Sequence, residues 1–115
     1  MKRTIKIPLY HTSIQVRVVA DVGRCAAEIH KKHKEPLSED YSGCRGLSFS
    51  FSNDVRFVLL SASELTHGLI AHELSHAIED IISHAGSTEV DRGYLTEMVT
   101  DDIYKFVLWK RVRVG

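Results

Sequence analysis

The hydrophobic period of this chain changes from that of strands to that of helices near Ser61, and this change limits the fold more than any other feature. Before it, apolar residues alternate with serines over 47–52, which is the period of a half-buried strand. Asn53-Asp54 separates this run from a second apolar run over 55–60. We therefore expect two strands joined by a two-residue hairpin, followed directly by a change to helical structure.

The residues after this change have the pattern of two helices. Ser61 and Glu64 have the spacing of a capping box, so the first helix is expected to begin at Ser61, and Gly86 supplies its stop. A last helix is expected from about Thr88. Its apolar positions are Val90, Tyr94, Met98, Tyr104, Val107 and Leu108.

The N-terminal part completes the expected fold. Alternating β-branched residues predict strands over 4–9 and 14–20, and Pro8 places the first of them at an edge of the sheet. Asp21 can cap a helix that ends before Glu35. The chain is therefore predicted to form one α+β domain over its 115 residues, with a mostly antiparallel sheet and three helices.

Charge and hydropathy exclude several classes of protein. There are 15 Lys and Arg against 15 Asp and Glu, so the net charge is zero and nucleic acid is not expected as a partner. The first residues lack the apolar run of a secretory signal, and no segment has the roughly 20 apolar residues of a membrane span. We therefore expect a cytoplasmic protein that does not bind membranes and whose two cysteines remain thiols.

The most informative motif is HELSH at residues 72–76, an HExxH sequence within the first long helix. Histidines four apart on a helix lie only about 40° apart around its axis, so His72 and His76 can reach one cation. Neutral imidazole is a good Zn²⁺ ligand, and Glu73 can take a proton from metal-bound water. The flanking residues are uncharged, so the motif is expected to be half-buried, where unpaired polar groups are costly.

A zinc site of this kind needs a third protein ligand, and the last helix offers one. The spacing of metzincins fails, because Glu79 and Ile82 stand where that pattern has Gly and His. Glu97 and Asp101 are one helical turn apart on the expected apolar stripe of the last helix. Glu97 as the third ligand and Asp101 as hydrogen-bond acceptor of a ligating imidazole would satisfy both carboxylates.

HELSH at 72–76 followed by the Glu97-to-Asp101 sequence EMVTD resembles the gluzincin pattern of thermolysin-like metallopeptidases, HExxH followed by ExxxD. The short chain also resembles minimal gluzincins and small phage-encoded zincin-like proteins. The resemblance implies a small zincin-like domain that cleaves peptide or protein substrates, in the host cytoplasm if the protein is phage-encoded. By the same analogy, the 55–60 strand is expected to be the edge that pairs with substrate.

Carried over to this sequence, the resemblance implies that His72, His76 and Glu97 bind Zn²⁺. Glu73 would be the general base and later the general acid, and Asp101 would orient a ligating histidine. The thermolysin-like enzymes also use a Tyr or His from a further domain to stabilise the oxyanion. The candidates here match no motif position; they are Tyr94, Tyr104, His67 and His84, of which the two tyrosines and His84 are expected near the cleft.

Two other interpretations stay open. The protein could be a noncatalytic zinc-binding protein that acts as an interaction or regulatory module, since zinc contributes directly to the folding of small domains. It could also be a latent enzyme whose basic C-terminal segment, 110–115, folds over the cleft. The oligomeric state is left open.

Three further residues carry weaker expectations. His30 and His33 could form a second metal site with a cysteine, but we expect them to lie on the surface among lysines. Asp80 is one turn past His76 and is expected either as an exposed carboxylate or as a partner of that imidazole.

Overall fold

A computed structural model describes residues 2–7, 10–37, 39–52, 54–85 and 89–114. The elements, in chain order, are β1 (Lys2–Ile7), β2 (Thr12–Val19), α1 (Val22–Lys32), β3 (Gly46–Ser50), β4 (Val55–Ser61), a 3₁₀ turn (Ala62–Glu64), α2 (His67–Ala85) and α3 (Glu89–Val114). The α+β class is therefore confirmed. The expected helix stop at Gly86 and start at Thr88 lie outside the described residues, as do Pro8 and Asn53.

The four strands form one mixed sheet in the order β1-β2-β4-β3. β1 pairs antiparallel with β2, and β3 pairs antiparallel with β4, whereas β2 and β4 run parallel. The predicted edge position of the first strand is thus confirmed. The prediction that the 55–60 strand forms an edge is wrong, because β4 lies between β2 and β3. A strand that is apolar on both faces is typical of the interior of a sheet.

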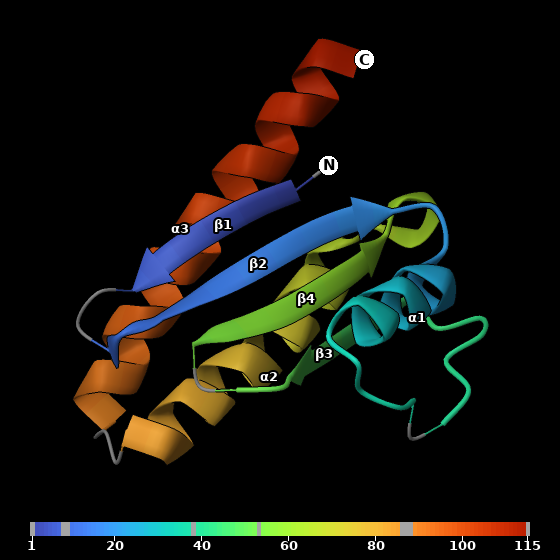
Figure 1. Cartoon of the computed structure of the whole chain (residues 1–115). Helices are drawn as coiled ribbons and strands as arrows, with labels where there is room; N and C mark the ends of the chain where they lie inside the picture. The colour runs from blue at the N-terminus through green and yellow to red at the C-terminus, as the bar shows by residue number, and fades with distance from the viewer. Residues whose placement is uncertain (1, 8–9, 38, 53, 86–88, 115) are drawn as a thin grey trace.

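The sheet is covered on both faces (Figure 1). One face packs against α2 and α3, and its contacts come from alternate strand residues such as Ile14, Val16, Val58 and Leu60. The other face packs against α1 through the opposite set of residues, which includes Phe57 and Leu59. Successive side chains of a strand point to opposite faces, so one short sheet serves two cores.

The start of α2 differs from the prediction. The chain forms a 3₁₀ turn after β4, and the helix begins at His67 rather than Ser61. Ser61 is still a strand residue and donates its backbone N–H to the Arg45 carbonyl at 2.8 Å. Thr66 caps the helix instead, since its Oγ1 accepts the backbone N–H of Leu69 at 3.0 Å. Capping by Asp21 at α1 is confirmed by its bond from the Arg24 N–H.

The buried stripe of α3 also differs from the prediction. Leu95, Val99 and Ile103 are fully buried against α2 and the sheet, whereas Tyr94 is 61% exposed. Apolar residues occur on several sides of this helix, so their spacing fits more than one stripe. Two other expected positions, Met98 and Tyr104, are partly buried against the core, as predicted. The side chains of Val90, Val107 and Leu108 lie outside the described residues.

Candidate metal centre

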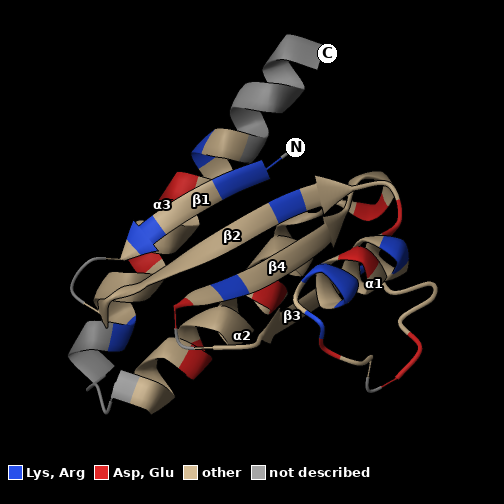
Figure 2. Cartoon of the chain, viewed as in Figure 1, with Lys and Arg blue, Asp and Glu red and all other residues tan. Residues whose placement is uncertain are grey.

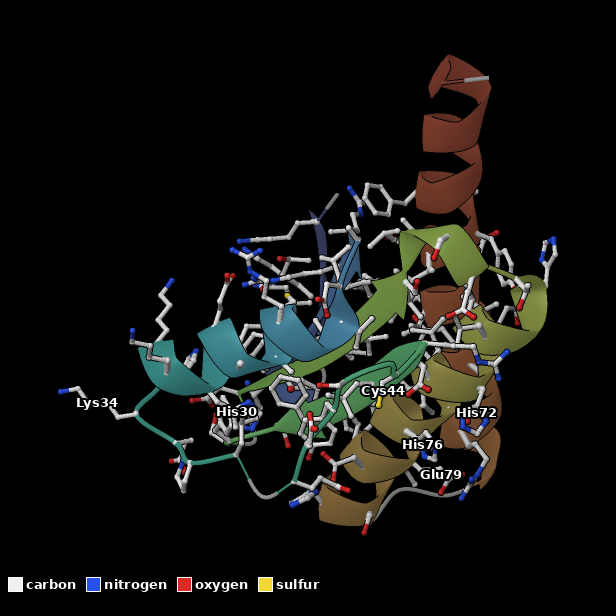
Figure 3. All side chains as sticks on the ribbon, turned by 90° about the vertical axis from the view of Figure 1, so that its right-hand side faces the viewer. His30, Lys34, Cys44, His72, His76 and Glu79 are labelled. Carbon is white, nitrogen blue, oxygen red and sulfur yellow. The ribbon has the colours of Figure 1, made fainter. Side chains whose placement is uncertain are left out.

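The two histidines of HELSH lie together on the solvent side of α2. The Nε2 atoms of His72 and His76 are 3.2 Å apart, and their rings meet edge to face with centroids 4.7 Å apart. Figure 3 shows both side chains on the outer side of α2, followed along the helix by Glu79. The four-residue spacing therefore brings the two imidazoles to one point, as the motif predicts.

This separation can be compared with that of two ligands on one metal ion. Zn–N bonds of 2.0–2.1 Å at a tetrahedral angle place two ligand nitrogens roughly 3.3–3.4 Å apart. The 3.2 Å between the Nε2 atoms is close to that value. Both histidines are exposed, so a cation can reach them from solvent. The separation of the two nitrogens is thus compatible with two ligands of one zinc ion, and without metal the two rings share a hydrogen bond.

Glu73 lies on the inner side of the same helix turn. It is buried, with Oε2 4.0 Å from His72 Nε2. Burial raises the pKa of the Glu73 carboxyl above its ordinary value, and the positive charge of protonated His72 and His76 lowers it by a smaller amount. A carboxyl held this way beside two imidazoles is suited to accept a proton.

Gly46 of β3 makes the position of Glu73 possible. A Cβ at residue 46 would lie 2.8 Å from Glu73 Cγ and 2.9 Å from Leu69 Cδ1. These distances are shorter than real carbon contacts, so only glycine lets the strand come this close to the helix. The sequence analysis missed this residue, because a single glycine at the start of a strand has no pattern that connects it with a distant helix.

A groove of about 390 Å³ runs between β3 and α2 beside Glu73 and His76. At its floor Arg56 of β4 is almost completely buried and donates from Nε to Asp80 Oδ2 at 2.7 Å. Arg56 also donates from Nη1 to Thr12 Oγ1 at 2.6 Å. These bonds tie α2 to the sheet one helical turn beyond His76. Asp80 is thus a partner of Arg56, and Arg56 is a second residue that the sequence analysis missed.

Glu97 and Asp101 do not join the histidines. They line a separate hollow on α3 with Tyr94 and Met98, and Asp101 pairs with Lys105 at 2.9 Å. Within the parts of the chain that the structure describes, no group of three or more His, Cys, Asp or Glu side chains could hold a metal ion. Glu97 as third ligand and Asp101 as hydrogen-bond acceptor of a ligating imidazole stay predictions.

The other residues expected near the cleft have different contacts. Tyr104 donates its hydroxyl to the His67 carbonyl at 2.9 Å, and the two rings stack, so Tyr104 fastens α3 to the start of α2. His84 donates from Nδ1 to the Asp80 carbonyl at 2.8 Å and does not line the groove. Tyr94 borders the hollow on α3.

His30 corrects a further expectation. It is buried rather than on the surface, and its Nδ1 donates to the Ala26 carbonyl at 2.8 Å. Its ring packs against Phe49 and Phe51 with centroids 4.9 and 4.8 Å away. His33 at the end of α1 is exposed, as expected. Phe49 and Phe51 of the 47–52 segment cover the His30 ring, and the sequence did not indicate this contact.

Comparison of the chain with known proteins found no matching family model, no matching curated protein and no matching solved structure. The resemblance to gluzincins therefore depends on the two motifs alone. No helix among the described residues is long and apolar enough to cross a membrane. Any conclusion about activity must come from the geometry of the groove and the histidine pair.

Proposed function

We propose that this protein is a zinc-dependent metallopeptidase that acts in the cytoplasm on a peptide or protein substrate. The observation that carries the proposal is the arrangement of His72, His76 and Glu73: two imidazole nitrogens 3.2 Å apart at the surface, with a buried carboxylate beside them. Three titratable groups of these types in one helix turn match the needs of metal-assisted hydrolysis.

Each residue has a distinct part in this proposal. His72 and His76 would hold Zn²⁺, which when bound polarises a carbonyl and lowers the pKa of a coordinated water. Glu73 accepts the proton of the attacking water and returns it to the leaving amine. β3, the outer strand of the sheet beside α2, offers its edge to an extended substrate, in place of the strand first expected to do so.

The third ligand depends on the rotation of α3 about its axis. Glu97 lies two residues from both Leu95 and Val99, and two residues correspond to about 160° around a helix. Since Leu95 and Val99 face the core, Glu97 faces away from it. For Glu97 to complete the site, α3 would have to turn about its own axis.

One alternative has specific support. A noncatalytic zinc-binding protein needs no oxyanion-stabilising residue, although a structural zinc site takes four protein ligands. In the described residues Tyr104 is engaged with the His67 carbonyl, and neither tyrosine of α3 lines the groove. These contacts favour a zinc protein without hydrolytic activity as the second candidate.

The substitution Glu73→Gln separates the two candidates. If the protein is a peptidase, this variant keeps about one equivalent of zinc, measured by elemental analysis, but loses on the order of 10²- to 10⁴-fold in hydrolysis of a peptide library. The isosteric change leaves the fold and the histidines in place. Hydrolysis at the wild-type rate in this variant would rule out Glu73 as the base, and unchanged biological activity would favour the noncatalytic candidate.

A further inference from the structure

The groove between β3 and α2 carries several polar groups within a lining that is otherwise apolar. Leu47 and Phe49 pack on the α1 side of the sheet, so the residues between them and after them, Ser48 and Ser50, point to the α2 side. The Ser50 hydroxyl lies 3.5 Å from Asp80 Oδ2, which agrees with this direction. The wall therefore presents two hydroxyl groups where a pocket for a large apolar side chain would present aliphatic carbon.

The charges of the groove are unequal. Arg56 is buried beneath the groove, and its Nε and Nη1 donate to Asp80 and Thr12. Its positive charge is therefore paired with the Asp80 carboxylate. The Asp80 side chain itself is 37% exposed. Glu73 supplies a second carboxylate at the other end. Without bound metal and with neutral histidines, the described lining residues carry two negative charges and one positive charge. His84 Nδ1 lies 3.3 Å from the second oxygen of Asp80, Oδ1.

We propose that this groove is the subsite for a cationic substrate side chain, that of lysine or arginine. This inference rests on the proposed function, because a peptide bond that lies next to Glu73 and His76 places a neighbouring side chain in the groove. The cationic group donates hydrogen bonds to the Asp80 carboxylate and to the hydroxyl oxygens of Ser48 and Ser50. An apolar side chain would cover these groups without bonding to them, and an acidic one would face two carboxylates.

Binding is tested with acetylated, amidated hexapeptides that differ only in one central residue: lysine, norleucine or glutamate. Affinity is measured by NMR titration of the wild-type protein, with the backbone amides of Ser48 and Ser50 as reporters. The lysine peptide is expected to bind at least tenfold more tightly than the norleucine peptide, to shift both reporters and to weaken as salt is added. Equal affinity for lysine and norleucine overturns the proposal.

Two variants locate the effect. Asp80→Asn is expected to remove the preference for lysine, and the double variant Ser48→Ala and Ser50→Ala, which leaves the buried pair intact, is expected to reduce lysine affinity at least threefold. Glu28→Gln is the matched control, since this exposed carboxylate lies on α1, away from the groove. The proposal is wrong if Glu28→Gln weakens lysine binding as much as the double variant does.

The outcome is separate from that of the proposed function. Zinc binding with hydrolysis of the norleucine peptide in preference to the lysine peptide would overturn the subsite and leave the peptidase standing. Lysine-specific shifts at Ser48 and Ser50 without hydrolysis of any peptide would support the subsite and count against the peptidase.

Discussion

The two long helices carry the two halves of the motif, and residue spacing predicts the positions of the motif residues on α2 but not on α3. On α2 the predicted pair, His72 and His76, comes together at 3.2 Å. On α3 the predicted partner Glu97 lies in a different hollow from the histidines. The first relation is internal to one helix and is fixed by the helical repeat. The second depends on how one helix is rotated against another, which is decided by packing.

The composition of each helix shows why the rotation of α2 was predictable and that of α3 was not. On α2 the apolar residues lie mainly on one side, and Leu74, Ala77, Ile78 and Ile81 are all buried. On α3 an apolar stripe through Leu95 competes with one through Tyr94, and they differ by about 100° around the axis. If the helix is buried through the other stripe, it is rotated by this angle, and every polar residue faces another side.

The largest expected effect is the loss of zinc when a histidine of α2 is replaced. His76→Ala should lower zinc affinity by more than roughly 100-fold, because loss of a ligand exceeds the 10- to 100-fold cost of losing its supporting partners. Glu97→Gln, its counterpart on α3, should change affinity less than about twofold if the helix keeps the orientation described. Isothermal titration with zinc gives both values.

His33→Ala is the control for the histidine variant, because this residue is also exposed on a helix but lies at the end of α1. Its zinc affinity should equal that of the wild type. A tenfold loss in Glu97→Gln would restore the motif-based assignment and show that α3 turns when metal binds. Unchanged zinc binding in His76→Ala would contradict the metal centre itself.

The buried stripe of α3 is tested through stability. Leu95→Ala removes a fully buried side chain from the α2–α3 contact and should lower the free energy of unfolding by about 3 kcal/mol. Tyr94→Ala, one residue away but exposed, should lower it by less than about 0.5 kcal/mol. Urea denaturation measures both. The reverse order of effects would mean that α3 packs through the stripe expected from the sequence.

The approach of β3 to α2 is tested with two glycines. Gly46→Ala places a Cβ against Glu73 and Leu69 and should cost about 1–3 kcal/mol of stability while it reduces hydrolysis at least roughly tenfold. Gly68→Ala, near the start of α2, meets no atom closer than 3.9 Å and should stabilise the protein slightly. Equal activity of the Gly46 variant and the wild type would contradict the prediction, because it would show that Glu73 tolerates a Cβ at residue 46.

The smallest expected effect concerns Gly93 on α3. A Cβ added there meets nothing within 4 Å, so Gly93→Ala should raise the free energy of unfolding by about 0.5–1 kcal/mol through helix propensity alone. Zinc affinity should stay unchanged. A destabilising result, read from the urea midpoint, would indicate that α3 approaches another part of the chain at this position.

The sequence predicted those features that depend on the regular repeat of a single helix or strand. The strand pattern, the cap at Asp21 and the histidine pair all follow from spacing along the chain, and all agree with the structure. The position of β4 inside the sheet follows from strand pairing and was predicted incorrectly. Strand order depends on which connections cross, and neighbouring residues carry little information about it.

The residues that were missed are those whose importance arises only from contacts between elements. Arg56 has the alternation of an ordinary strand residue, yet it lies under α2 and holds Asp80 and Thr12. Gly46 is one of seven glycines in the chain, and only its distance from Glu73 distinguishes it. Charged residues are distributed over every layer of the fold (Figure 2), so charge alone did not indicate that Arg56 is buried.

All the residues that line the groove lie between Gly46 and Asp80, in the contiguous unit β3, β4 and α2. The parallel pairing of β2 with β4, by contrast, joins segments such as Thr12 and Asp54 that are 42 residues apart. Local contacts form faster than distant ones during folding. We therefore expect the unit of β3, β4 and α2 to form early in folding, and the groove to be complete once Arg56 bonds to Thr12 of β2.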